Sequence, residues 1–246
     1  MAKYSSADVG FYLVGGYDVL GYQTTITVKK EKLTEETHVL GDAWIEHDVV
    51  KLQKAQIAQD GFYDDVSDGN NDALLANVGT ANVLCLGGEG NTIGKQFIGF
   101  AGALQADYER IVSRGAFHKA KAMHEGVGAV EEAVVLHTHS TETAASGNTE
   151  STPHDNGASS ANGGSGYLQV SALTLGGYTS VTVKVRHSTD NVTYADLITF
   201  TVVTAAKIAE RKAVAGTINR YTASSWAFNG AGSGQSVKLM AGVHRD

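Results

Sequence analysis

The chain has 246 residues and uses its turn-forming residues unevenly, with 29 glycines but one proline, Pro153. Excess glycine with almost no proline excludes collagen-like and proline-rich disordered chains, because both need proline to extend the backbone. A single cysteine, Cys85, excludes an internal disulfide framework and a cysteine-built zinc site, and a net charge of −7 gives no basic footprint for tight duplex binding.

Targeting signals are equally scarce. Residues 1–10 contain one lysine and lead into no apolar run, and no stretch approaches the roughly 18 apolar residues of a membrane span. We therefore expect no secretory signal and no membrane contact, with synthesis in a reducing cytoplasm.

Alternation of apolar and polar residues with a period of two dominates the chain and predicts strands. The clearest case is residues 180–186, where Val181, Val183 and Val185 point one way and the polar residues between them point the other. The full set of expected strands is 22–29, 44–50, 83–86, 96–101, 133–139, 167–171, 180–186, 197–203, 216–222 and 236–244. Short glycine-, asparagine- or aspartate-rich connectors separate them, which is typical of a sandwich or barrel.

Helices are few. Residues 72–77 predict one short helix with Asp72 as a possible N-cap, and residues 204–214 are compatible with another. Residues 48–59 fit a helix and a strand about equally. The expected fold class is mainly β: an antiparallel β-sandwich or barrel with one or two short helices.

Composition divides the chain into three parts. Residues 140–166 contain 18 Gly, Ser, Thr or Asn among 27 positions and no large apolar side chain, so they predict a flexible linker or arm. Residues 1–139 carry 19 acids and 11 bases, whereas residues 167–246 carry four acids and eight bases. We therefore expect an acidic N-terminal β-sandwich over 1–139 and a basic C-terminal β-sandwich over 167–246. A single domain with a long loop is the alternative.

No catalytic or metal-binding constellation stands out. His137 and His139 alternate on a predicted strand, but the candidate third ligands, Glu142 and His154, lie in the polar segment 140–166, so we interpret the two histidines as solvent-facing residues near a strand end. Cys85 lies in an apolar run and is interpreted as a core residue. Residues 87–95 end in Gly-Lys but lack the Ser or Thr of a phosphate-binding loop. We expect no enzyme activity, no cofactor and no bound metal.

Acidic residues concentrate in one segment. Residues 31–72 carry eleven acids against three lysines, and within them Asp60, Asp64, Asp65 and Asp68 form the densest cluster. The spacing of Asp64 and Asp68 does not match a calcium loop, and a glycosidase pair requires a geometry that sequence does not supply. We interpret the cluster as an acidic, solvated turn.

Two runs carry a family resemblance: LGDAWIEH (residues 40–47) and QDGFYDD (residues 59–65). They resemble the N-terminal half of major tail proteins of long-tailed bacteriophages, and residues 135–137, 162–164, 187–196 and 215–221 are similar to later parts of the same family. Residues 187–196 also look like a segment of sugar-binding jelly-roll domains. The motifs are diffuse structural ones spread over most of the chain.

The resemblance implies a specific function. Tail tube proteins are β-sandwiches that polymerise into stacked rings around a channel for DNA, and the lumen is typically electronegative. It implies a virion structural protein of the tail whose partners are other copies of itself, other tail proteins and DNA that passes without specific binding. In this interpretation, Asp60, Asp64, Asp65 and Asp68 face the lumen.

A second hypothesis is a capsid decoration or carbohydrate-binding module. Sugar-binding jelly rolls present exposed aromatic side chains, and the candidates are Tyr178, Tyr194, Tyr221 and Trp226. The sequence leaves open whether the C-terminal half is a tube domain or a decoration domain, and whether a ring would be hexameric or a pseudo-hexameric trimer.

Overall fold

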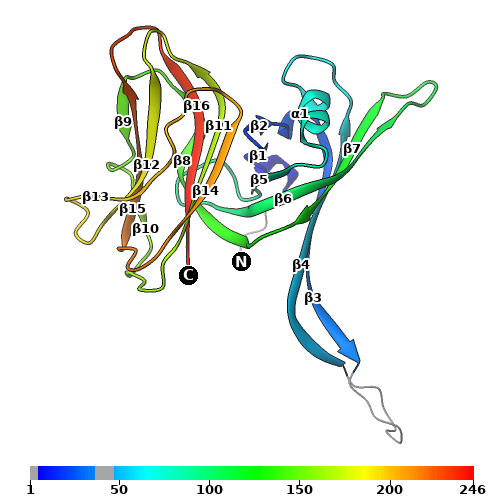
Figure 1. Ribbon diagram of the computed structural model, residues 1–246, viewed down its shortest axis with the longest axis horizontal. Helices are drawn as coiled ribbons and strands as arrows, with labels where there is room; N and C mark the ends of the chain where they lie inside the picture. The colour runs from blue at the N-terminus through cyan, green and yellow to red at the C-terminus, as the bar shows by residue number, and fades with distance from the viewer. Residues whose placement is uncertain (1–4, 37–46) are drawn as a thin grey trace, which may run out of the picture. The chain divides into compact units, whose positions relative to one another are not determined.

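The computed structural model describes residues 5–36 and 47–246, and this part of the chain is mainly β (Figure 1). Short 3-10 turns at Ser6–Asp8 and Leu20–Tyr22 flank the first two strands. The strands and the helix are, in chain order, β1 (Phe11–Val14), β2 (Tyr17–Asp18), β3 (Gln23–Glu36), β4 (His47–Phe62), α1 (Asn70–Asn77), β5 (Ala81–Gly87), β6 (Gln96–Ile111), β7 (Lys119–Gly126), β8 (Val130–Glu142), β9 (Ser146–Asn148), β10 (His154–Asp155), β11 (Gly164–Thr174), β12 (Ser180–Ser188), β13 (Ala195–Thr199), β14 (Ile208–Val214), β15 (Tyr221–Asn229) and β16 (Ser236–Arg245). The predicted antiparallel, sandwich-like β fold is confirmed.

The chain forms two compact units, neither of them a continuous stretch of sequence. Unit 1 consists of Met1–Gly21, Asn82–Ala101 and Val130–Asp246, and unit 2 of Tyr22–Ala81 and Gly102–Ala129. This division differs from the expected boundaries at 139 and 166. The reason is that β5, the first half of β6 and β8 pair within the same sheet as the C-terminal strands, and composition does not reveal such long-range pairing.

Unit 1 is built around a β-sandwich. Its larger sheet has the strand order β14-β11-β16-β8-β6-β5-β1-β2, and its second sheet runs β10-β15-β12-β13 with β9 also paired to β15. The two sheets pack through an apolar core to which β8, β11, β12, β13, β15 and β16 all contribute. Val181, Val183 and Val185 are fully buried in this core, as the alternation in their strand predicts.

The larger sheet also carries a second core on its other face. There Phe11 of β1, Phe97 of β6 and Tyr167 of β11 pack in edge-to-face contacts, with ring centroids 5.9 and 5.7 Å apart. Because both faces are covered, β11 is buried without interruption from Gly164 to Ser171. Gly99 makes room for this packing, since a Cβ there would lie 2.6 Å from the Tyr167 ring.

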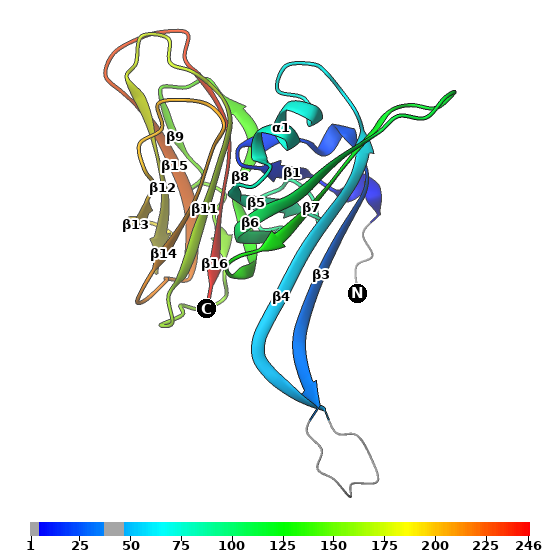
Figure 2. The same ribbon diagram turned by 45° about the vertical axis from the view of Figure 1, so that its right-hand side comes forward.

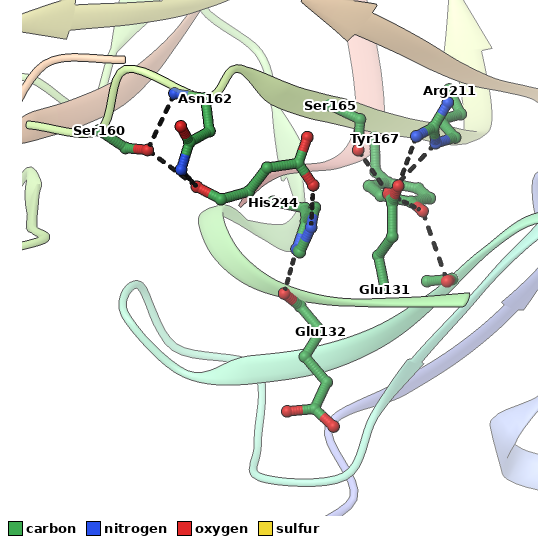
Figure 3. Close-up of polar contacts among 10 residues, drawn as sticks. Glu131, Glu132, Ser160, Asn162, Ser165, Tyr167, Arg211 and His244 are labelled. Atoms are coloured by element: carbon green, nitrogen blue, oxygen red, sulfur yellow. Dashed lines mark hydrogen bonds and ion pairs between the residues drawn. The ribbon is translucent and has the colours of Figure 1, made fainter. Parts of the chain in front are cut away.

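The expected linker is part of unit 1. Within residues 140–166, β9 pairs with β15 through Ser146–Asn148, β10 pairs with β15 through His154 and Asp155, and Ser160 bridges to Ile218. Polar contacts hold this segment where apolar burial does not: Ser160 Oγ and Asn162 Nδ2 donate to the backbone oxygen of Asp246, at 2.8 and 3.5 Å (Figure 3). A composition without large apolar residues therefore forms an ordered sheet edge.

Unit 2 is a four-stranded sheet with the order β3-β4-β7-β6, in which β6 takes part from Ala103 onward. Helix α1 covers one face, where Leu74 packs on Ala120 and Ala122 of β7 and on the rings of Tyr63 and Tyr108. The predicted helix is present but starts at Asn70 with Gly69 as its N-cap, so Asp72 lies inside its first turn.

Several other local predictions change. Residues 48–59, which fitted a helix and a strand, belong to β4, because β3 pairs with this stretch and β7 joins on the other side from Gln56 onward. The helix over 204–214 is wrong, since residues 208–214 form β14 along the edge of β11. The predicted strand over 44–50 is described only from His47, and residues 44–46 lie outside the described part of the chain. Strands β1, β2, β7, β9 and β10 were not predicted, and the strand expected over 216–222 is replaced by β15, which begins at Tyr221.

Candidate assembly surfaces

The most unusual feature of unit 2 is a long two-stranded arm. Strand β4 pairs with β7 only from Gln56 to Phe62, while its pairing with β3 continues back to His47. Over residues 47–55, β4 therefore has no neighbour besides β3 among the described residues. At ~3.4 Å per residue, this two-stranded segment is about 30 Å long. Figures 1 and 2 both show this ribbon extending beyond the other strands of unit 2.

The side chains that the structure describes on the arm, in residues 28–32 and 53–55, are mostly polar. Lys29 forms an ion pair with Glu31 and Lys54 one with Glu125 at 3.5 Å, while Val28 is only partly buried. Two-stranded ribbons are marginally stable in water, because neither face is covered. The outer edge of β3 also presents unpaired backbone groups to the surroundings.

The four predicted site acids lie at the other end of β4. Asp60 is on β4 and lies 3.6 Å from Lys119 Nζ and 3.4 Å from Lys121 Nζ, so neighbouring lysines offset its charge. Asp64, Asp65 and Asp68 follow β4 in the turn that leads to α1. The structure thus groups the last three and separates Asp60 from them. Whether any of them faces a channel depends on an assembly, and the lumen assignment stays a prediction.

A buried ionic network, which sequence inspection did not find, lies in unit 1 (Figure 3). The Glu131 carboxylate of β8 accepts hydrogen bonds from Tyr167 Oη at 2.6 Å, from Ser165 Oγ at 2.5 Å and from the Arg211 guanidinium. Burial alone raises the pKa of Glu131, but the hydrogen bonds from Arg211, Ser165 and Tyr167 outweigh it and hold this pKa below its usual value. The network ties β8, β11 and β14 together across the larger sheet.

The network around Glu131 links strands to one another. Every donor around Glu131 is fixed by a strand, and the Tyr167 hydroxyl also reaches the Gly99 carbonyl oxygen at 3.4 Å. The signal in the sequence is the pair of glutamates 131–132 at the start of β8, and it does not identify a partner 80 residues away.

The histidine prediction is wrong in one respect. His137 and His139 are buried rather than solvent-facing, and they have separate partners. His137 packs edge-on against Trp226 with ring centroids 5.0 Å apart, whereas His139 Nε2 bonds to Ser171 Oγ at 2.8 Å. Burial lowers the pKa of His139 to about 4, so it is neutral at pH 7. In the described part of the chain, no three His, Cys, Asp or Glu side chains come together as a metal site would require.

The aromatic residues considered for sugar binding are not displayed as a platform. Trp226 is buried against His137, and Tyr178 packs on Phe228 with ring centroids 5.4 Å apart. Tyr194 and Tyr221 are half-buried. A hollow of about 370 Å³ on the second sheet is lined by Lys184, Arg186 and Asp196 among others, and these three side chains already pair with one another. No helix among the described residues is long and apolar enough to cross a membrane.

Comparisons with known proteins find likeness only among solved structures. No family model matches the chain, and no curated protein matches it. A protein from the virion of a native gene transfer agent particle is 12% identical, with a TM-score of 0.41, covering 53% of this chain and 98% of its own. A protein from the tail of an empty gene transfer agent particle with C6 symmetry is 10% identical, with a TM-score of 0.39, covering 52% and 97%. The SPP1 Dit protein, described as a hub of an adsorption apparatus, is 10% identical, with a TM-score of 0.35, covering 95% and 98%. Likeness at this level assigns no function to the chain.

Proposed function

We propose that this protein is a structural subunit of a bacteriophage tail that works by assembling with copies of itself and with other tail proteins. The observation that carries the proposal is the two-stranded arm of β3 and β4, which continues for nine residues of β4 past the last strand that supports it. A ribbon of this kind gains stability when a neighbouring chain covers a face or adds to its open edge.

Within that class we propose the tail tube subunit, which forms stacked rings around the channel for DNA. The sequence resemblance to major tail proteins supports this assignment, and the acidic turn after β4 is compatible with an electronegative lumen. On this proposal the protein is not an enzyme and needs no cofactor: its side chains hold strands together and present surfaces to neighbouring chains. The capsid decoration or carbohydrate-binding hypothesis loses support, because its four aromatic residues are buried or half-buried.

The test is to shorten the arm without disturbing the rest of unit 2. Glu31 and Lys54 are register partners, so replacing residues 32–53 with Asn-Gly closes the ribbon with a two-residue hairpin turn. We expect the full chain to form rings or tubes in negative-stain microscopy and analytical ultracentrifugation. The shortened chain should stay monomeric while its circular dichroism spectrum and melting remain those of a folded protein.

A matched control shortens an unrelated exposed connection, residues 190–193 between β12 and β13, and should assemble normally. A full-length chain that remains monomeric at high concentration after prolonged incubation would refute self-assembly. A full chain that binds an array of glycans while remaining monomeric would favour the carbohydrate-binding alternative.

A further inference from the structure

The end of the unit 2 sheet opposite the arm carries an exposed aromatic pair with basic residues beside it. Phe117, in the turn between β6 and β7, is 82% exposed, and it packs edge-to-face on Phe62 with ring centroids 5.7 Å apart. Lys119 is the cross-strand partner of Phe62, and Arg114 lies at the tip of the same turn. We call Phe62, Val112, Arg114, Phe117 and Lys119 the aromatic–basic end.

The local backbone holds this surface in place. The amide of Ala116 donates to the Ser113 carbonyl oxygen at 3.3 Å, and Gly115 adopts the positive φ of 76° that the tight turn requires. Between Arg110 and Lys121 there are four basic residues and no acid. Arg114 has no polar partner within the described chain, and Val112 is 62% exposed. The turn therefore displays apolar rings and a positive charge for which the described part of the chain supplies no partner.

The same unit carries a surface of the opposite charge. In the turn after β4, Asp64, Asp65 and Asp68 surround Val66, which is 60% exposed, and Leu75 of α1 is 59% exposed. We call these five residues the acidic turn. The turn is ordered by its own hydrogen bonds, from the Val66 amide to Asp64 Oδ1 at 3.0 Å and from the Gly69 amide to the Val66 carbonyl oxygen at 2.8 Å. Asp65 has no polar partner among the described residues.

Strand register places the two surfaces on opposite faces of the sheet. Ala120 and Ala122 of β7 face α1, so the alternate residues Lys119 and Lys121 point to the other face. Phe62 shares that other face, because it lies directly opposite Lys119 in the β4–β7 pair. The acidic turn leads into α1 and belongs to the helix side. Unlike surfaces on opposite faces suit a head-to-tail contact, in which one chain meets two neighbours in different ways.

We propose that the aromatic–basic end of one chain docks on the acidic turn of a second copy of this chain. The two surfaces match in charge, and each combines exposed apolar side chains with an unpaired ion, Arg114 on one and Asp65 on the other. The chain as a whole carries 26 acids and 19 bases, so a second copy offers predominantly acidic surface to a basic patch. Repeated head-to-tail contact closes a ring or extends a filament. The inference rests on the proposed self-assembly and names one interface within it.

This assignment competes with the lumen assignment of Asp64, Asp65 and Asp68, and a charge swap separates the two. Asp65→Arg and Arg114→Glu each turn an attraction into a repulsion, and we expect each to raise the concentration needed for assembly about tenfold or more. The double variant Asp65→Arg/Arg114→Glu restores opposite charges across the contact and should recover assembly. Both side chains are exposed, so all three proteins should melt like the original chain. Arg114→Lys, which keeps the charge, is the matched control and should assemble normally.

The apolar part of the contact is tested by Phe117→Ala. An aromatic anchor at an interface typically contributes enough that its truncation weakens association about tenfold or more. An equal mixture of Asp65→Arg and Arg114→Glu chains tests the head-to-tail geometry, because unlike chains meet with opposite charges at both contacts: Arg114 meets Asp65 at one, and the two introduced side chains meet at the other. The mixture should therefore assemble in ultracentrifugation at concentrations where neither variant assembles alone.

The outcomes are decisive for this interface alone. If the original chain assembles and the single charge reversals assemble equally well, the docking proposal is overturned and the proposed function stands. If the charge reversals leave assembly intact but block DNA passage, the acidic residues face the lumen and the docking proposal fails. A gel-shift assay with duplex DNA tests the alternative. If the original chain binds DNA, Arg114→Glu does not, and both assemble equally well, the aromatic–basic end is a nucleic-acid surface and the docking proposal fails. If the original chain never assembles, the proposed function fails first.

Discussion

Removing Arg211 tests the role of the buried network in unit 1. Glu131 is 9% exposed and accepts hydrogen bonds from Ser165, Tyr167 and Arg211. Arg211→Met keeps the aliphatic stem but leaves the carboxylate with two neutral donors. Breaking a buried pair in this way costs about 3–5 kcal/mol. Because the Arg211 side chain is 23% exposed, water replaces part of the lost interaction, and we expect a loss near the lower limit, about 3 kcal/mol.

The assay is urea unfolding followed by the fluorescence of Trp226, which lies in the core of unit 1. The chain has two tryptophans, so a Trp44→Phe background leaves Trp226 as the only reporter. The double variant Glu131→Leu/Arg211→Met should recover part of the loss, because no buried charge remains. Arg220→Met, which removes an exposed ion pair with Asp155, is the matched control and should change stability much less.

The pH dependence supplies an independent check. The folded-state pKa of Glu131 lies below its ordinary value of 4.5, so the stabilisation is present above about pH 4.5 and is lost as the pH falls through the folded-state pKa. Arg211→Met removes the hydrogen bond that lowers this pKa most, so we expect the pKa of Glu131 to rise in the variant. The difference in unfolding free energy between the two proteins should therefore shrink between about pH 5 and pH 3. A loss below about 1 kcal/mol at pH 7, or a difference that does not shrink with acid, would refute this reasoning.

Three further predictions concern close packing and buried side chains. Gly147→Ala should destabilise unit 1 by about 1–3 kcal/mol in thermal melting, because the added Cβ would lie 2.3 Å from the Trp226 ring; an unchanged melt would contradict the packing. Burial raises the pKa of Cys85 to about 12, so the native chain should not react with Ellman's reagent at pH 8, whereas one thiol should react in denaturant; rapid native reaction would contradict its burial. Burial lowers the pKa of His124 from 6.5 to about 4, so the unfolded chain takes up its proton at a higher pH than the folded chain, and stability falls with acid across that window. His124→Gln should flatten this fall in urea titrations at several pH values, and an identical slope would show that His124 is not responsible.

The elements with a regular pattern were predictable because local sequence determines them. Val181, Val183 and Val185 alternate with polar residues, and the strand they predict is β12, with all three in the core. Cys85, in an apolar run, lies in the second core of unit 1 as predicted. The short helix before residue 78 was also predictable, although its start at Asn70 was not.

Other elements were decided by partners that are distant in sequence. Residues 204–214 have an acceptable helical composition, but the free edge of β11 accepts residues 208–214 as β14, and tertiary pairing outweighs a weak local preference. His137 and His139 look like surface residues in their strand, yet Trp226 and Ser171 cover them. The Glu131–Arg211 pair is invisible in the sequence for the same reason.

The sequence by itself determined a mainly β protein without a disulfide framework, with its glycines available for tight turns and an excess of acid between residues 31 and 72. Those properties follow from composition and short-range alternation, which can be read in a segment without knowing what it packs against. Only the tertiary structure decided that strands within the polar segment 140–166 form an edge of the second sheet. It also decided that β3 and β4 extend beyond β7, the strand next to β4. The physical reason is that backbone hydrogen bonds between strands depend on which strands come together, and a strand's own residues do not specify its neighbour.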